Sequence, residues 1–198
     1  MSTEHKAVLL SSRPELCAKI LNGEKTVEIR KNRPNLKPPF KCYIYCTNKP
    51  PLSAFANHYD CLRGTFKTGA TPVTGFTRDK AEDLFEIYNG RVIGEFICDK
   101  IKVIDRPPYA VKEDVENLLR GSGLSYEQLK DYAGWEGKTL YESASLYGWH
   151  ISQLDIYDAP VELSRLTALR QTKFGWEPNE IKRAPQSWCY VEENGGHI

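Results

Sequence analysis

Three charged side chains lie close together near the start of the chain. Lys25, Glu28 and Arg30 belong to GEKTVEIRK, residues 23–31, in which threonine, valine and isoleucine separate the charges. An ammonium and a guanidinium can hold a carbonyl or phosphate oxygen, and a carboxylate can orient them or accept a proton. These residue types therefore predict a site for an oxygen-rich ligand.

A helix is expected immediately before the charged segment. Residues 12–22 carry Ser12 and Glu15 at capping-box spacing, a proline in the first turn and an apolar stripe at helical intervals. Gly23 suits the left-handed position that ends a helix.

Residues 25–30 predict a strand, because β-branched residues separate the charges. Glu28 and Arg30 would then share one face, while Lys25 would take the other face at the mouth of the strand, next to the helix end. An alternative is a strand with one face in water, on which an exposed Glu28–Arg30 pair contributes only ~0–1 kcal/mol and no chemistry.

The charge of the whole chain is nearly balanced, but its distribution is not. The 198 residues include 27 Lys plus Arg and 26 Asp plus Glu, which gives a net charge of +1 and argues against a general polyanion-binding protein. Residues 13–41 alone contain eight basic and three acidic residues. This local excess favours a small phosphate-bearing or nucleic-acid ligand, although a solvated loop at the proline-rich residues 32–40 would also explain it.

Six cysteines occur without a CxxC pair or zinc-finger spacing, so free thiols in a cytoplasmic protein, with no metal and no cofactor, are expected. Cys42, Ile44 and Cys46 predict a core-facing row on a strand at 41–47. Tyr43 and Tyr45 would take its other face, either to stack a base or to pack. No apolar run approaches the ~20 residues that a membrane helix requires, and a soluble protein is predicted.

The remaining pattern predicts one α+β domain over residues 1–198. Strands are expected at 7–10, 25–30, 41–47, 91–104, 145–160 and 187–193, and further helices at 79–89, 111–119 and 125–133. Gly94 is expected at a bulge or a close backbone approach within the strand at 91–104. Capping-box spacing occurs again at Asp79 and Glu82 and at Ser125 and Gln128. Residues 48–90 read as an inserted arm, because glycine, proline and threonine interrupt any period before the helix at 79–89. Short strands with few helices favour a mixed, closed sheet.

The pattern G-x-K-x-x-E-x-R at Gly23, Lys25, Glu28 and Arg30 resembles the signature of ASCH domains, which belong to the PUA-like superfamily. The segments YGWHI at 147–151, IYDAP at 156–160 and PQSWCYVEE at 185–193 look like those of longer bacterial and phage members. The resemblance implies a PUA-like mixed β-barrel of about five to seven strands flanked by helices. It also implies a cleft lined by the motif and a role in binding RNA or nucleotides.

The resemblance also bears on activity. Some small ASCH proteins act as amidohydrolases on N4-acetylcytidine, using the motif lysine, a threonine three residues later and a downstream glutamate. Lys25 matches that lysine, whereas Glu28 occupies the threonine position. Glu113, Glu116 and Glu127 all remain open for the glutamate. Other members resemble ribonucleases, for which Lys25 would stabilise phosphorane charge and Glu28 or His150 would move a proton.

The leading hypothesis is an RNA- or modified-nucleotide-binding module with Lys25, Glu28 and Arg30 at the floor of a basic cleft. Its predicted neighbours are Arg13, Tyr43, Tyr45, Trp149 and His150, although Trp149 and His150 would also fit ordinary packing at a strand start. One alternative is a metal-independent hydrolase of RNA or an acylated nucleoside. Another is a partner-binding module that uses the arm at 48–90.

Overall fold

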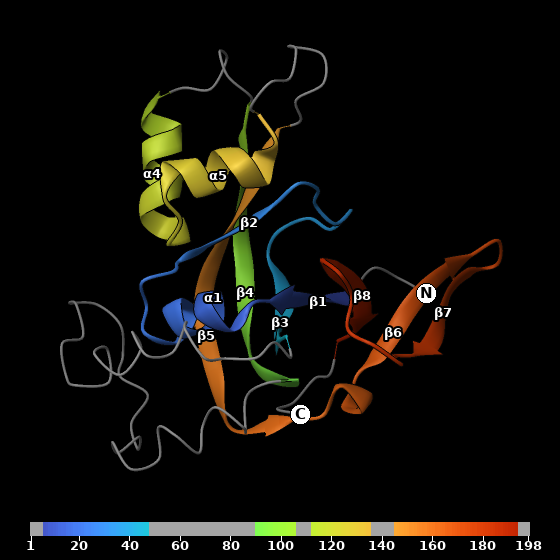
Figure 1. Cartoon of the computed structure of the whole chain (residues 1–198). Helices are drawn as coiled ribbons and strands as arrows, with labels where there is room; N and C mark the ends of the chain where they lie inside the picture. Colours follow the sequence, from blue (N-terminus) through green and yellow to red (C-terminus); the bar gives the residue numbers. More distant parts are fainter. Residues whose placement is uncertain (1–5, 48–89, 106–111, 136–144, 194–198) are drawn as a thin grey trace.

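The chain forms one mixed sheet with helices packed against it (Figure 1). A computed structural model describes residues 6–47, 90–105, 112–135 and 145–193. Within these residues the strand order is β2-β5-β4-β3-β1-β8-β6-β7. The strands are β1 (Lys6–Ser12), β2 (Val27–Arg30), β3 (Phe40–Cys46), β4 (Arg91–Ile104), β5 (Leu146–Val161), β6 (Thr167–Thr172), β7 (Gly175–Glu180) and β8 (Trp188–Glu192). The helices are α1 (Pro14–Leu21), α4 (Lys112–Ser122), α5 (Tyr126–Ala133) and a short 3-10 helix, η3 (Leu163–Arg165).

The middle of the sheet is a parallel pair, β1 and β3, and every residue of β1 is buried. α1 follows β1 and ends as predicted, because Gly23 adopts a φ of 75° and its N–H donates to Ile20 O at 3.0 Å. The chain then enters β2, an edge strand that pairs with β5. This path brings the charged segment back towards the end of β1.

β4 and β5 are long antiparallel strands whose register shifts at several points. Gly94 lies at one of these shifts, and a Cβ there would come 2.4 Å from the carbonyl oxygen of Asp155. The sequence predicted a bulge or a close backbone approach at this glycine, and the structure confirms it.

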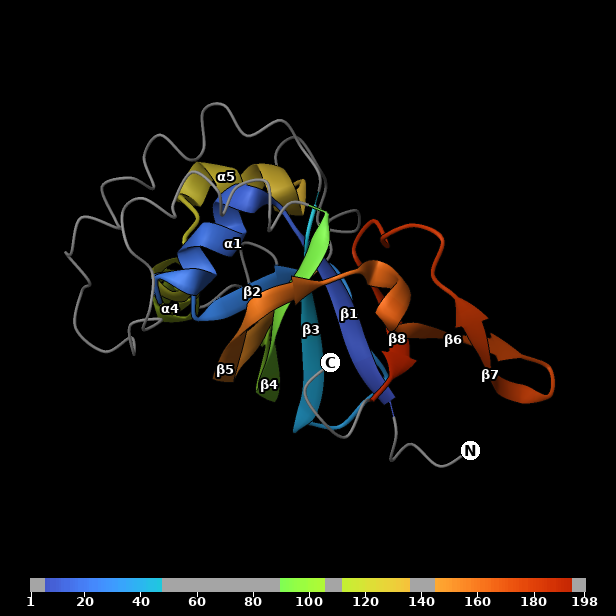
Figure 2. The same cartoon turned by 90° about the horizontal axis from the view of Figure 1, so that it is seen from below.

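Three apolar clusters hold the elements together. One lies between α1 and the row Cys42, Ile44 and Cys46, which therefore faces the core as predicted. A second covers the opposite face of β1 and β3. The third packs α4 and α5 against β2, β4 and β5. Figure 1 shows α4 and α5 together at this end of the molecule, whereas the β6–β7 hairpin projects from the other end, as Figure 2 also shows.

The predicted α+β architecture with a mixed sheet is confirmed, but two details differ. The described residues form eight strands rather than about five to seven, because the β6–β7 hairpin was not predicted. Closure into a barrel is not seen among the described strands: β2 and β7 lie at the two ends of the strand order, and the hairpin extends the sheet away from β2.

The two predicted capping boxes that fall among the described residues had different outcomes. Ser125 and Gln128 form one at the start of α5, with the Ser125 hydroxyl accepting from Gln128 N at 3.2 Å. The predicted box of Ser12 and Glu15 was wrong, because Ser12 is the last residue of β1 and Arg13 caps α1 without a side-chain hydrogen bond.

The arm at 48–90 and the helix at 79–89 lie outside the described residues, except for Gly90, so the arm stays a prediction. The same holds for the single domain over 1–198 that contains it. None of the helices in the described ranges is long and apolar enough to cross a membrane.

Candidate functional site

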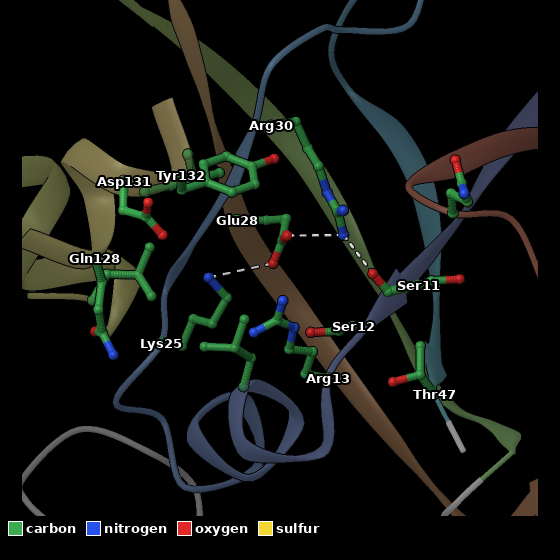
Figure 3. Close-up of a pocket in the computed structure, with 14 residues that line it drawn as sticks. Ser11, Ser12, Arg13, Lys25, Glu28, Arg30, Thr47, Gln128, Asp131 and Tyr132 are labelled. Carbon is green, nitrogen blue, oxygen red and sulfur yellow. Dashed lines mark hydrogen bonds and ion pairs between the residues drawn. The ribbon is translucent and has the colours of Figure 1, made fainter. Parts of the chain in front are cut away.

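The charged segment lines a cavity of about 530 Å³ between α1, β2, α5 and the ends of β1 and β3 (Figure 3). This volume falls within the roughly 300–1,000 Å³ of small-molecule sites. The lining includes Ser11, Ser12, Arg13, Leu16, Lys25, Glu28, Ile29, Arg30, Thr47, Leu124, Gln128, Asp131, Tyr132 and Gln186.

Lys25, Glu28 and Arg30 form a buried ion-pair chain, here called the triad, in this cavity. Glu28 lies between the two cations, with Oε1 2.9 Å from an Arg30 guanidinium nitrogen and Oε2 3.3 Å from Lys25 Nζ. Their exposed fractions are 2% for Lys25, 3% for Glu28 and 7% for Arg30. The alternative of a wet strand face therefore does not hold for these residues.

Lys25 reaches Glu28 because it precedes β2 instead of belonging to it. The predicted strand alternation put the two side chains on opposite faces, and this detail was wrong. The backbone N–H of Lys25 donates to Lys19 O at 2.8 Å, close to the end of α1. Its Nζ donates to Val27 O at 2.9 Å and to Ser122 O at 3.1 Å. Two carbonyls and one carboxylate thus fix the ammonium.

Arg30 connects β2 to the neighbouring strand ends. One terminal nitrogen donates to Ser11 O at 2.7 Å, and the other donates to Ser187 Oγ at 3.3 Å. Arg30 Nε has no hydrogen-bond partner among the described residues. Since a buried donor without a partner costs about 1–3 kcal/mol, this atom is suited to a ligand acceptor.

Hydroxyl groups gather at the ends of the parallel strands β1 and β3. Ser11 and Ser12 end β1, Thr47 follows β3, and Thr47 N donates to Ser12 O at 2.9 Å. The side-chain oxygens of all three are buried, and none of them has a hydrogen-bond partner in the described part of the chain. These groups can both donate to and accept from a ligand.

The opposite wall comes from α5, which presents Gln128, Asp131 and Tyr132 to the cavity (Figure 3). Burial raises the pKa of Tyr132 above its ordinary value, so its hydroxyl remains protonated and able to donate. The cavity lining as a whole holds three cations (Arg13, Lys25, Arg30) and two carboxylates (Glu28, Asp131), a net charge of +1.

The structure brings four of the predicted site residues to the cavity: Arg13, Lys25, Glu28 and Arg30. The expected neighbours on the sheet lie elsewhere. Tyr43 is fully buried in the second apolar cluster, and Tyr45 packs against it. Trp149 is fully buried in the first cluster. These rings fill the core on both faces of the sheet, so they do not line the cavity.

His150 also lies away from the triad. It pairs in register with Val27 on β2, and its side chain is 48% exposed. Its Nδ1 lies 2.7 Å from Asp99 Oδ1, and this hydrogen bond lowers the pKa of Asp99. His150 is absent from the cavity lining, to which Lys25 and Glu28 both belong.

Sequence reasoning missed the hydroxyls at the strand ends and the α5 wall. A usable signal existed for the first group, since Ser11–Ser12 and Thr47 directly follow apolar runs that became strands. The sequence did not show that these strands are parallel neighbours. Parallel pairing places their carboxyl ends side by side.

The described residues contain no group of three or more His, Cys, Asp or Glu side chains that could hold a metal ion. Cys17, Cys42, Cys46, Cys98 and Cys189 are not joined in disulfides.

Comparison with known proteins gave the following. No protein-family model matches the sequence, and no curated protein matches it significantly. Among solved structures, a serine-to-alanine mutant of ZmASCH from Zymomonas mobilis matches with a TM-score of 0.48 and 18% identity, covering 93% of this chain and 87% of that one. A tyrosine-to-phenylalanine mutant of ZmASCH from Zymomonas mobilis matches with a TM-score of 0.44 and 18% identity, covering 93% of this chain and 88% of that one. ASCH from Zymomonas mobilis matches with a TM-score of 0.43 and 19% identity, covering 93% of this chain and 86% of that one.

Proposed function

We propose that the protein is a PUA-like, ASCH-type module that binds RNA or a nucleotide in the cavity formed around Lys25, Glu28 and Arg30. The observation that carries the proposal is the triad itself. Two cations and one carboxylate lie together, almost without solvent exposure, in the wall of a ligand-sized cavity. The net charge of these three side chains is +1, and burying a net charge is costly unless an opposite charge compensates it. A phosphate-bearing ligand would supply that charge.

The polar atoms of the cavity fit such a ligand. Arg30 Nε and the Ser11, Ser12 and Thr47 hydroxyls offer hydrogen bonds that the described residues do not use. Arg13 is exposed at the start of α1 and can contact phosphate oxygens directly. Tyr132 offers a partly buried ring and a hydroxyl next to the same space.

The test is a titration of wild-type protein and Lys25→Ala with short single-stranded RNA and with nucleotides. We expect the variant to bind at least tenfold more weakly, because a hydrogen bond to a charged group contributes about 1.5–3 kcal/mol. Equal binding by the two proteins would contradict the proposal.

Lys25 also holds the fold, so a second variant keeps the test decisive. Arg13→Gln removes an exposed cation of the cavity lining without touching the triad, and it should weaken binding in a protein that unfolds like the wild type. Arg165→Gln in η3, outside the lining, is the matched control and should bind like the wild type. Unchanged affinity in a folded Arg13→Gln would count against the proposal.

A second candidate function is metal-independent hydrolysis of RNA or an acylated nucleoside. The observation that favours it is the 3.3 Å contact between Lys25 Nζ and Glu28 Oε2 in a cavity that is also lined by the hydroxyl-bearing side chains of Ser11, Ser12, Thr47 and Tyr132. Lys25 would stabilise charge on the transition state and Glu28 would move a proton. Turnover should persist with chelator present and disappear in Lys25→Ala and Glu28→Gln. No product above the blank with RNA and with N4-acetylcytidine would contradict it.

A further inference from the structure

Two exposed loops next to the cavity carry only positive charges. Loop 31–39, between β2 and β3, contains Lys31, Arg33 and Lys37, and segment 181–187, between β7 and β8, contains Lys182 and Arg183. All five side chains belong to exposed residues, and neither stretch contains an acidic residue. These two stretches are called the rim loops below.

One end of each rim loop lies beside the cavity. Ser187, at the end of segment 181–187, accepts from Arg30, and Gln186 before it lines the cavity. In loop 31–39, Lys31 Nζ lies 5.2 Å from the centre of the Tyr132 ring, which also lines the cavity. A chain segment leaving the cavity in this direction would therefore meet both loops.

Two aromatic side chains of β8 lie beside the rim loops. Trp188 Nε1 donates to Asn32 Oδ1 at 2.8 Å, and the Tyr190 hydroxyl accepts from Asn35 N at 2.7 Å. Their ring centres are 5.3 Å apart and nearly perpendicular, and both residues are partly exposed. Hydrogen bonds to loop 31–39 thus hold an ordered pair of rings beside that loop, on the strand that follows segment 181–187.

We infer that the rim loops and this ring pair bind single-stranded RNA that continues from the nucleotide in the cavity. The inference rests on the proposed function and deepens it, because it makes the ligand a strand and not a free nucleotide. Five cations outside the cavity exceed what the phosphates of one seated nucleotide can contact. A strand supplies one phosphate per residue to the loops and bases to the rings.

The distribution of charge and the rings favour this occupant over others. The acidic residues of β8 and its continuation, Glu192 and Glu193, lie at the opposite end of the strand from Ser187, which is the end beside the cavity. A duplex would hide the base faces that aromatic rings recognise, whereas a single strand exposes them.

The experiment compares a nucleoside monophosphate with single-stranded RNA of roughly 8 nucleotides. The rim variant replaces all five cations: Lys31→Gln, Arg33→Gln, Lys37→Gln, Lys182→Gln and Arg183→Gln. We expect the wild type to bind the RNA at least tenfold more tightly than the monophosphate, and the rim variant to lose that gain. The slope of log affinity against log salt should also flatten by about 0.7 for each lost phosphate contact.

The matched control removes five exposed cations elsewhere, at Lys100, Lys112, Arg165, Arg170 and Lys173. It should bind RNA like the wild type, and the rim variant should bind the monophosphate like the wild type. Equal RNA affinity of wild type and rim variant, an equal loss in the control, or equally tight binding of duplex RNA would each overturn the inference.

The outcomes separate this inference from the proposed cavity function. A wild type that binds the monophosphate through Arg13 and Lys25 but gains nothing from strand length would overturn only the inference. RNA binding that requires the rim loops but is unchanged by Arg13→Gln and Lys25→Ala would overturn the cavity function on which the inference rests.

Discussion

Glu28 holds two buried cations together, and its removal should reveal what the triad contributes to stability. Lys25 and Arg30 would keep their backbone hydrogen bonds in Glu28→Gln but would lose the carboxylate between them. Breaking a buried ion pair by removing one partner typically costs about 3–5 kcal/mol. We therefore expect the free energy of unfolding, measured in urea, to fall by this amount.

The control for Glu28→Gln is an exposed ion pair on a helix surface. Lys112 and Glu116 lie one helical turn apart in α4, with 3.7 Å between their charged atoms. Glu116→Gln should change stability by less than about 0.5 kcal/mol. If both substitutions had the same small effect, the triad would contribute no more than a surface pair.

At the residue scale the sequence predicted the charged centre better than its surroundings. Lys25, Glu28 and Arg30 are neighbours in sequence, so their clustering needed only local structure. Tyr43 and His150 could not be placed in the same way. Strand alternation assigns each residue a face, but it does not show that both faces of β3 are covered or which long-range partner, such as Asp99, a side chain meets.

At the scale of elements, the close contact between β4 and β5 depends on Gly94. Gly94→Ala would place a methyl group 2.4 Å from Asp155 O, a backbone atom that cannot move without separating the strands. We expect a loss of about 1–3 kcal/mol in the free energy of unfolding, measured in urea.

Gly148→Ala provides the comparison within β5. Its new methyl group would lie 2.8 Å from Leu118 Cδ1, the end of a side chain that can shift. The loss should therefore be smaller than that of Gly94→Ala. A larger loss of unfolding free energy for Gly148→Ala than for Gly94→Ala would contradict this prediction, because it would show that β4 and β5 separate more easily than Leu118 of α4 shifts.

The sequence predicted the long strands and α5 because their signals were local. β4 is rich in β-branched residues, and α5 begins with a capping box that the structure confirms. The β6–β7 hairpin was missed for an equally physical reason. Most of its residues are exposed, and Pro178 interrupts its last strand, so it shows no regular apolar alternation.

At the scale of the whole molecule, burial protects the thiols. Burial raises the pKa of Cys98 to about 12 and that of Cys189 to about 11, and it also raises the pKa of Cys42. An unfolded thiol ionises near 8.5, and only the thiolate reacts. In a Cys61→Ser protein, iodoacetamide at about pH 7.5 should therefore modify the native chain on the order of 100-fold more slowly than the urea-unfolded chain.

The same shifts set the sign of a pH dependence. Because the unfolded chain loses its thiol protons first, these groups lower stability as pH rises from about 8.5 towards the folded pKa values. Rapid labelling of the native Cys61→Ser protein at a described cysteine, located by mass spectrometry, would contradict this picture of the core.

The link between the end of β3 and the start of β4 affects how such a protein can change over generations. The chain leaves the sheet at Thr47, in the cavity wall, and returns at Gly90, whose N–H donates to Cys46 O at 2.9 Å. The two ends of the intervening stretch are thus fastened together beside the ligand space. Closing a loop costs only ~0.6 kcal/mol more for each doubling of its length. Insertions, deletions or replacements between these two points can therefore accumulate without changing the strand register. Each such change would attach to the sheet at the edge of the candidate site.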